Sequence, residues 1–481
     1  MVRVPGTRVI LLGIVLLAFL VRVYHLDFQS LWRDEMDAIR FAREPLSILL
    51  SNFTRAGWNG PLYYLLLRPW LTVAGDSEFA LRFFSLFWGV LAVPLTYAVS
   101  RRWFTPFPAT LAPLLITLSP YLVWYSQEGK MYALLLALIL LSMYLYTQAL
   151  ERGRLWLWLG HVLVTSLGLY VHVLAAIIVP LQALLFVIWW PRYQARWRSW
   201  LAAMAALTLP YLPLALWEIP TLLSGFATGH KFVPLPQMLN IMLLAFAQGL
   251  WPVYNWLAIS VFALLLAGAI LLEENHRQDG WRVAATCLLW FFFPIISVYL
   301  ISLKMPLFLD RYLIWTAPAL YLLAALGVMK IGHRTRLLAT ILLIAIVVIN
   351  ARGLWWQAHT IIKSDFRAAA TYLRQHRNPD ELIIFHISYV RPTFEYYYGD
   401  SSPYADGIPT NEATTEAWLD AAMRAQTRGY DTVWLCYSEA TMWDERQMVK
   451  AWLDRHGRRT EHASFARVEV FRYELGPDGP L

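Results

Sequence analysis

Two adjacent carboxylates, Asp34 and Glu35, stand in the stretch SLWRDEMDAIRF, which directly follows an apolar run fit for a membrane. One interpretation places them, with Asp37, on the solvated face of an amphipathic helix at the membrane surface. The other interpretation makes them a reaction centre, in which a carboxylate takes a proton from an acceptor hydroxyl or amine. The electrophile for such a reaction would have to come from the membrane.

Three cations are expected at the outer ends of later apolar runs, on the membrane face that normally carries fewer positive charges. They are Arg82, Lys130 and Arg311. Arg82 and Lys130 can be interpreted as side chains that only extend toward the lipid headgroups, and Arg311 can form a structural pair with Asp310. Taken together, the three cations form a candidate site for a lipid-linked phosphate.

Other polar side chains near the same outer ends complete a candidate cleft. They come from the stretches NGPLYYLLLRPW, YSQEGKMY and LDRYL and from the end of the fifth apolar run. The candidate cleft residues are Asn59, Tyr63, Tyr125, Glu128, Tyr132, His172 and Tyr312. A single histidine such as His172 is more often a satisfied interfacial residue than a catalyst, so both roles stay open for it.

Membrane helices are the elements that must position these residues. Of the 481 residues, 58% are hydrophobic and 15% are charged, whereas an ordinary soluble domain carries about 25% charged residues. A spanning helix needs about 20 mostly apolar residues. Eleven runs qualify: 8–25, 80–100, 107–125, 131–150, 155–171, 173–190, 199–219, 255–272, 283–303, 312–330 and 336–352. A break at GLWPVYNW predicts an interfacial or re-entrant piece before the span at 255–272.

Basic links between the runs set the expected orientation. Arginine and lysine concentrate in every second link, and we place these links and the N-terminus in the cytoplasm. An odd number of spans then puts the first loop, about 26–79, and residues 353–481 outside. We therefore expect a multi-pass protein of the plasma membrane, with residues 1–352 as a transmembrane domain whose first outer loop carries interfacial helices.

The C-terminal region, residues 353–481, has a different pattern. Amphipathic helical stretches at 365–377, 416–429 and 444–457 alternate with apolar strands at 381–386, 431–437 and 467–475, which predicts a small extracytoplasmic α/β domain. It contains neither a glycine-rich phosphate loop nor a nucleophile motif, so we expect it to bind or shield a ligand. The net charge of +8 is explained by the basic links, and no nucleic-acid partner is expected.

Two other functions remain alternatives. A transporter or lipid flippase should carry charged residues in the middle of its spans, whereas here the ionisable groups stand almost entirely at the ends. A non-catalytic sensor would depend on the outer domain and would tolerate the loss of Asp34. These two criteria separate both alternatives from an enzyme.

Five segments, in order along residues 8–330, resemble the polyprenyl-phosphate-dependent membrane glycosyltransferases of the GT-C fold, in the branch of protein O-mannosyltransferases and lipid A aminoarabinose transferases. The segments are SLWRDE, NGPLYYLLL, EFALRFFSLFWGVLAVPLTYAVSRRWF, LSPYLVWYSQEGKMYALLLAL and DRYLIWTAPAL. The resemblance implies a membrane all-α fold and the inverting transfer of a sugar from a polyprenyl-phosphate donor to a lipid, glycan or protein acceptor. Membrane lipids are the other expected partners.

The resemblance also implies roles for individual residues. The family carries an acidic pair in its first outer loop, and its catalytic base corresponds to Asp34. Glu35 would then orient the acceptor, bind a sugar hydroxyl or hold a metal, while Arg82, Lys130 or Arg311 would meet the leaving phosphate. Lys130 stands where relatives often have arginine, which keeps the charge but loses the bidentate fork.

The sequence departs from the family at a second point and leaves the cofactor open. Asn59, Gly60 and Pro61 stand where relatives often have a His-Pro-Pro triplet, so acceptor binding does not carry over. Some relatives use a divalent cation and others do not. No second acidic cluster is close in sequence, so we expect no metal site and no certain cofactor.

Overall fold

The computed structural model describes residues 5–53, 60–223, 229–272, 280–399, 403–408, 410, 413–439, 444 and 446–475. Its contacts divide the chain into two compact units. The helical unit comprises Met1–Leu26 and Phe41–His359, and the α/β unit comprises Asp27–Arg40 and Thr360–Leu481. The segment 27–40, which carries the acidic pair, thus belongs with the C-terminal sheet, and helix α2 (Arg33–Arg43) is divided between the units.

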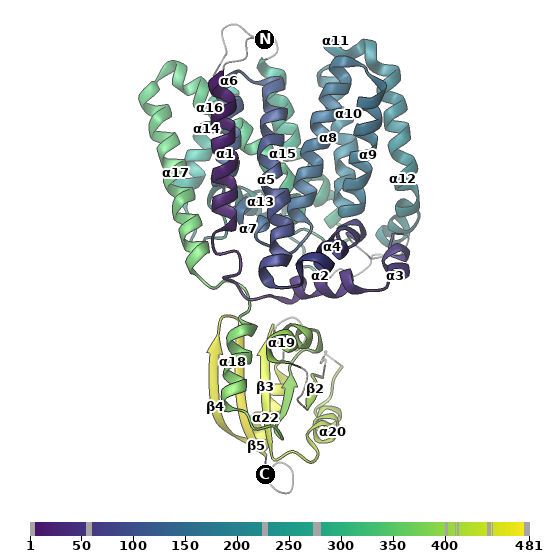
Figure 1. The fold of residues 1–481 in the computed structure, drawn as a ribbon, viewed down its shortest axis with the longest axis vertical. Coiled ribbons are helices and arrows are strands. Elements are labelled where there is room, and N and C mark those ends of the chain that lie inside the picture. The colour runs from purple at the N-terminus through teal and green to yellow at the C-terminus, as the bar shows by residue number, and fades with distance from the viewer. Residues whose placement is uncertain are drawn as a thin grey trace. The chain divides into compact units, whose positions relative to one another are not determined.

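The helical unit is a bundle of mostly long helices (Figure 1). Its elements are α1 (Pro5–Val23), α3 (Leu46–Ser51), α4 (Pro61–Ala74), α5 (Glu78–Trp103), α6 (Pro106–Leu118), α7 (Pro120–Ser126), α8 (Tyr132–Arg152), α9 (Leu155–Val171), η1 (Val173–Ile177), α10 (Ile178–Ile188), α11 (Trp190–Tyr193), η2 (Gln194–Arg196), α12 (Trp197–Leu223), α13 (Leu235–Gln248), α14 (Trp256–Leu271), α15 (Gly280–Ser302), η3 (Asp310–Thr316), α16 (Ala317–Arg334) and α17 (Arg336–His359).

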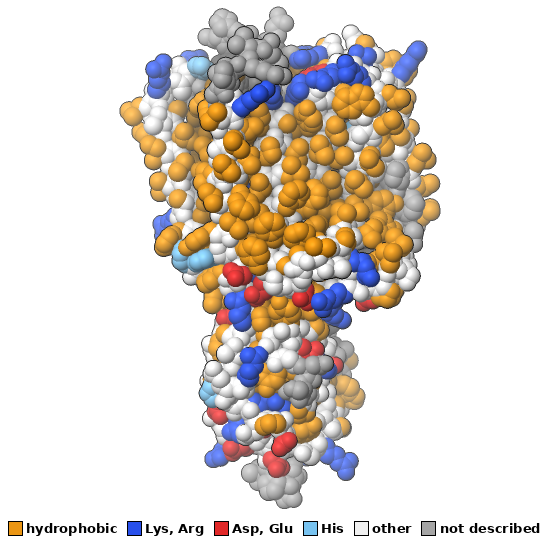
Figure 2. Space-filling view, in the orientation of Figure 1, with side chains coloured by type: hydrophobic (Ala, Val, Ile, Leu, Met, Phe, Trp, Pro, Cys, Tyr) orange, Lys and Arg blue, Asp and Glu red, His pale blue; other side chains and the backbone are white. Residues whose placement is uncertain are grey.

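Every run expected to cross the membrane is helical over most of its length. The runs 173–190 and 199–219, expected as two spans, fall largely on one pair of helical segments, Val173–Ile188 and Trp190–Leu209, that is bent by 83°. Within the described residues, five helices are long and apolar enough to cross alone, and the number is seven if each of two bent pairs forms one span. The mostly helical membrane fold is thus confirmed, while the number of eleven spans stays a prediction. Figure 2 shows a broad band of hydrophobic side chains over the helical unit, as a lipid-facing surface requires.

Local sequence explains the bend that precedes the candidate cleft. Between α6 and α7 the axis turns by 60° at Ser119 and Pro120. Pro120 has no backbone N–H and begins α7, where that N–H is not needed. The Ser119 hydroxyl accepts a hydrogen bond from the Leu122 amide at 3.3 Å and caps the new helix. This bend directs α7 toward the link that carries Glu128 and Lys130.

The α/β unit contains a five-stranded sheet in the order β2-β1-β3-β5-β4. Strands β2, β1 and β3 are parallel, and β5 and β4 are antiparallel to their neighbours. The elements are α18 (Phe366–His376), β1 (Leu382–Phe385), η4 (Ser388–Val390), α19 (Arg391–Tyr398), β2 (Tyr404–Asp406), α20 (Glu416–Thr427), β3 (Thr432–Ser438), α22 (Met448–His456), β4 (Gly457–Phe465) and β5 (Val468–Leu475). The expected small α/β domain is confirmed, and β2, α19 and β4 are additions to it.

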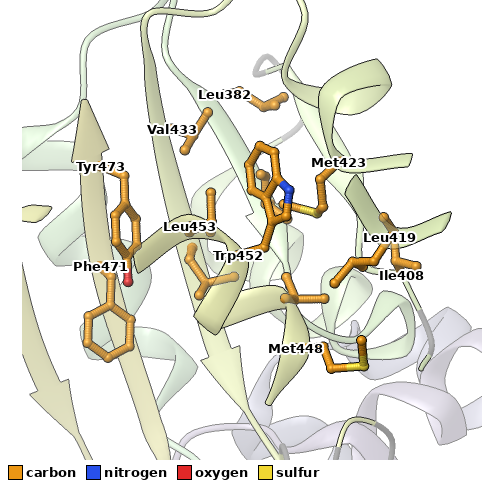
Figure 3. Close-up of a cluster of buried hydrophobic side chains, with 13 residues drawn as sticks. Leu382, Ile408, Leu419, Met423, Val433, Met448, Trp452, Leu453, Phe471 and Tyr473 are labelled. Carbon is orange, nitrogen blue, oxygen red and sulfur yellow. The ribbon is translucent and has the colours of Figure 1, made fainter. Parts of the chain in front are cut away.

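Two hydrophobic cores cover the two faces of this sheet because successive strand residues point in opposite directions. On one face Phe366 of α18 and Phe394 of α19 pack with Trp434 of β3. On the other face the helices α20 and α22 contribute a second cluster, which includes Met423 and Trp452 (Figure 3). The helices that follow β1 and β3 therefore lie on opposite faces, and such a switch point leaves a crevice at the carboxyl ends of the two strands.

Candidate functional site

The two carboxylates at the start of α2 have different surroundings within the α/β unit. The Glu35 side chain is fully buried, and its Oε2 lies 3.0 Å from Nζ of Lys363, which is itself 6% exposed. A buried carboxylate is tolerated when an opposite charge and hydrogen bonds compensate its lost hydration. Glu35 is therefore no solvated helix face, and that interpretation of the acidic pair is wrong for this residue.

Asp34 stays partly accessible, with 12% of its side chain exposed. Its Oδ1 accepts hydrogen bonds from two nitrogens of Arg33, Nε at 3.2 Å and Nη2 at 3.1 Å. The first turn of a helix also favours negative charge through the helix dipole. Both interactions favour the carboxylate form of Asp34, which is the form that accepts a proton.

Arg33 has a second carboxylate nearby. Its Nη1 lies 3.9 Å from Oε2 of Glu439, and its guanidinium carbon lies 4.8 Å from the ring centroid of Tyr389. The Tyr389 hydroxyl donates a 2.7 Å hydrogen bond to the same Glu439 oxygen, and burial followed by this carboxylate raises the pKa of Tyr389. Partial burial lowers the pKa of Arg33, but Asp34 and Glu439 more than offset it and leave the pKa raised.

Hydrogen bonds hold the segment before α2 against the C-terminal part of the α/β unit. The Gln29 side chain donates to the Thr360 carbonyl at 2.7 Å and accepts from the Ile362 amide at 2.9 Å. The Leu31 amide donates to the Tyr397 hydroxyl at 2.7 Å, and Arg367 donates to the Asp27 carbonyl at 2.8 Å. The acidic pair is therefore supported by residues from the far end of the chain.

In the helical unit, five of the expected cleft and cation residues form one connected group. The ring centroids of Tyr125 and Tyr132 are 5.5 Å apart, those of Tyr132 and Tyr312 are 6.4 Å apart, and those of Tyr312 and His172 are 4.7 Å apart. The guanidinium carbon of Arg311 lies 5.7 Å from the Tyr132 ring. These residues come from α7, α8, η3 and the junction of α9 with η1.

A second group joins Lys130 to α4 and α5. The Lys130 ammonium lies 5.9 Å from the Tyr64 ring, and Tyr64 packs on Tyr63 with 5.6 Å between centroids. The Lys130 carbonyl accepts from the Ser85 hydroxyl at 3.2 Å. Arg82 is buried one turn earlier on α5.

The remaining expected residues have simpler placements. Arg82 donates through Nη1 to the Leu26 carbonyl at 3.0 Å, so part of its hydrogen-bonding capacity holds the turn that follows α1. Glu128 is buried in the link before α8. Asn59 lies outside the described residues.

Two further residues approach these groups; the sequence had suggested Asp310 only as a pair for Arg311, and His230 not at all. Asp310 is within electrostatic range of Tyr121 and Tyr125. The His230 ring lies 6.4 Å from that of Tyr312, and partial burial together with the Arg311 charge lowers the pKa of His230. Only the tertiary fold shows these approaches, because the residues stand in unrelated segments.

No group of three or more His, Cys, Asp or Glu side chains in the described part of the chain is arranged to hold a metal ion. The oxygen-rich ligand sets that Mg²⁺ or Ca²⁺ prefer are therefore not seen among these residues. Metal dependence stays untested.

Comparison with known proteins finds one family model that matches part of the chain and several solved structures of similar fold. Residues 59–217 match the family model described as dolichyl-phosphate-mannose-protein mannosyltransferase, and no curated protein matches the sequence. ArnT from Cupriavidus metallidurans in the apo state has 14% identity and a TM-score of 0.59, over 96% of this chain and 97% of that one. The same protein bound to undecaprenyl phosphate aligns over 98% of both chains, with 14% identity and a TM-score of 0.58.

An archaeal relative of the fold is larger. The oligosaccharyltransferase AglB from Archaeoglobus fulgidus, in complex with an inhibitory peptide and a dolichol-phosphate, has 12% identity and a TM-score of 0.55. The alignment covers 97% of this chain and 74% of AglB. At such identities the likeness shows the fold, and the expected GT-C fold is confirmed.

Proposed function

We propose that this protein is an integral membrane glycosyltransferase that moves a sugar from a polyprenyl-phosphate-linked donor to an acceptor on the extracytoplasmic face. A fold alone does not establish an activity. The observation that carries the proposal is the difference between the two carboxylates: Glu35 is fully buried against Lys363, while Asp34 pairs with Arg33 at 3.1 Å and keeps 12% of its side chain exposed. Both carboxylates have a cationic partner, and Asp34 is the more accessible of the two, so we assign the role of the base to it.

In the proposed reaction, Asp34 accepts the proton of an acceptor hydroxyl or amine. The freed lone pair attacks the anomeric carbon of the sugar, and the bond from that carbon to the phosphate oxygen breaks on the opposite side. The bonding electrons leave with the polyprenyl phosphate, and the configuration at the anomeric carbon inverts. One bond forms, one breaks, and the proton resides on Asp34.

The leaving phosphate needs positive charge where its own charge develops. Arg311 and Lys130 are the main candidates, since each lies over a tyrosine ring of the helical unit. Arg82 is the third. The similar ArnT structure is bound to undecaprenyl phosphate and the AglB structure is in complex with a dolichol-phosphate, and this supports a lipid-phosphate donor here.

For Glu35 we propose orientation of the first turn of α2, because its ion pair with Lys363 occupies the carboxylate. No metal ion enters this proposal. The acceptor is a lipid, a glycan or a protein, and the surrounding partners are membrane lipids. We place the protein in the plasma membrane, with its N-terminus in the cytoplasm and residues 353–481 outside.

The test compares wild type with Asp34→Asn, using labelled polyprenyl-phosphate sugars and an extract of cell-envelope acceptors. We expect the variant to transfer label at least about 100-fold more slowly, within the range of general base catalysis. Asp37→Asn is the matched control, because Asp37 stands on the same helix and pairs with its own arginine, Arg40, at 3.5 Å. Equal activity of wild type and Asp34→Asn contradicts the base, and no transfer by any form favours a transporter or a sensor.

A further inference from the structure

The α/β unit surrounds the proposed base with its own side chains, and the first inference rests on the proposed function. Lys363 precedes α18, Tyr389 lies in η4 after β1, and Glu439 follows β3. The residues Tyr389 and Glu439 meet because β1 and β3 are neighbouring parallel strands whose carboxyl ends lie at the same edge. This edge is the switch point of the sheet, where α/β folds bind their ligands.

Arg33 connects this edge to Asp34. Its guanidinium donates two hydrogen bonds to Asp34 and lies 3.9 Å from Glu439, which also accepts from Tyr389. We propose that Arg33 is a positioning residue, shared between Asp34 and Glu439, through which the α/β unit sets the orientation and the charge balance of the base. The α/β unit then supplies the side chains that position the proposed base.

The sign of each effect follows from the charges. Charged and titratable groups around Arg33 and Asp34 within the α/β unit are Glu35, Asp37, Lys363, Tyr389 and Glu439. The positive charge of Arg33 stabilises the ionised form of Asp34. The Glu439 carboxylate also interacts with the Arg33 guanidinium and so weakens this stabilisation. Removing Arg33 and removing Glu439 must therefore shift the titration of Asp34 in opposite directions.

The experiment measures kcat/KM against pH for Arg33→Gln, Glu439→Gln and the double variant in the full-length protein. We expect the acid limb to move up by about one pH unit in Arg33→Gln and down by about half a unit in Glu439→Gln, since an opposite charge at this range shifts a carboxyl pKa by about 1–3 units. The double variant should behave as Arg33→Gln, because Glu439 acts through Arg33. Arg33→Lys should restore most of the wild-type profile.

Glu469→Gln is the matched control, since it removes an exposed carboxylate paired with His462 at 2.8 Å in the same unit. Shifts in the same direction for both single variants, or no shift beyond the control, overturn the inference while Asp34→Asn remains inactive. If Asp34→Asn retains its activity, the proposed function itself fails. These outcomes separate the two failures.

A second observation concerns the helical unit and is independent of the reaction. A cavity of about 610 Å³ lies between the C-terminal ends of α5 and α8 and the segment formed by α11 and η2. It is lined by Arg101, Arg102, Leu150, Glu151, Arg192, Tyr193, Ala195 and Arg196. Four arginines and one glutamate give this lining a formal charge of +3 (4 − 1). Among them, Glu151 pairs with Arg102 at 3.0 Å.

The arginines of this cavity are held in place. Arg196 lies against Gly153, where an added Cβ would stand 2.3 Å from its Nη1, and Arg101 lies 5.4 Å from the Tyr97 ring. Guanidinium groups bind phosphate oxygens in a fixed planar geometry. We infer that this cavity binds a phosphate group, from either an anionic lipid headgroup or a soluble phosphate.

The test uses purified full-length protein and vesicles of phosphatidylcholine with or without cardiolipin, with native mass spectrometry as the readout of bound lipid. Arg101→Gln with Arg196→Gln should reduce cardiolipin binding about tenfold, whereas Arg152→Gln with Arg154→Gln, which does not line the cavity, should not. Competition by millimolar inorganic phosphate identifies a soluble ligand, and its absence identifies a headgroup. Equal loss in both double variants overturns the inference, because it indicates general surface charge.

Discussion

At the scale of single residues, adjacent side chains of one chemical type perform different tasks. Asp34 and Glu35 follow each other in sequence. Asp34 pairs with Arg33 and keeps a small part of its side chain exposed, whereas Glu35 pairs with Lys363 and is fully buried. Their identity as the candidate pair could be predicted from the sequence, since carboxylates next to an apolar helix are unusual. The different partners of the two carboxylates could not be predicted, because Lys363 and Glu439 approach them only in the folded unit.

Lys130 offers a test of the proposed phosphate contacts. Lys130→Gln should lower kcat/KM about 100-fold, as the loss of one stabilising charge at a developing anion does. Lys130→Arg keeps the charge and should stay within about tenfold of wild type. The measurement is the rate of sugar release from labelled donor, and unchanged activity in Lys130→Gln would restrict Lys130 to packing against Tyr64.

Asp444 gives a prediction about pH and stability. Burial opposes its ionisation, but hydrogen bonds from His386, Thr410 and the amides of Met448 and Val449 lower its pKa to about 2. A lowered pKa stabilises the fold above the unfolded-state pKa of about 4, and the gain is lost as the pH falls toward 2. Asp444→Asn should thus cost about 1–2 kcal/mol at pH 7 and little near pH 2.

Thermal unfolding of the full-length protein at the two pH values checks this prediction. Asp454→Asn is a comparison variant, since Asp454 also has a lowered pKa but lies on an exposed part of α22. The same loss of stability at pH 7 and at pH 2 for Asp444→Asn would contradict the role of ionisation.

At the scale of elements, helices were easier to predict than their contacts. Long apolar runs end at charged or proline-containing links, so their bounds agree with the structure to within several residues. The edge strand β4 was missed because none of its residues is buried, and its sequence contains no apolar run. Likewise α22 begins at Met448 rather than near residue 444, because Gln447 has a positive φ of 53° and Asp444 accepts the first amides.

The contact between α5 and the link before α8 leaves no room for a side chain at position 129. A Cβ on Gly129 would stand 2.5 Å from Cδ2 of Leu81, so Gly129→Ala forces the link away from α5 and moves Lys130. We expect a destabilisation of about 1–3 kcal/mol with reduced transfer, and recovery in the double variant with Leu81→Ala. Gly13→Ala is the control, because an added Cβ there meets nothing within 4 Å.

At the scale of the whole molecule, the division into units does not follow the order of the chain. We expected a boundary near residue 353, whereas α17 continues to His359 and the segment 27–40 groups with the sheet. Local sequence could not show this, since the contact of Gln29 with Thr360 joins positions 331 residues apart. Hydropathy locates helices and strands, but it carries no information on such pairings.

The Glu35–Lys363 ion pair allows this long-range pairing to be tested. Glu35→Gln leaves a buried ammonium group without its partner charge and should destabilise the protein by about 3–5 kcal/mol. The double variant Glu35→Leu with Lys363→Met replaces the pair by apolar groups and should recover most of that stability. Thermal unfolding measures both, and a double variant as unstable as Glu35→Gln would contradict the pairing.

The attachment of the segment 27–40 to residues near 360 also has a consequence for how the protein is made. The ribosome completes the acidic segment before it reaches Lys363, Arg367 and Glu439, which support that segment. A chain interrupted before these residues lacks the supports of Asp34, even if all its membrane helices have been inserted. Under the proposed function, translation must therefore pass Glu439 before the protein can act on its lipid-linked donor, and shorter chains in the membrane are inactive.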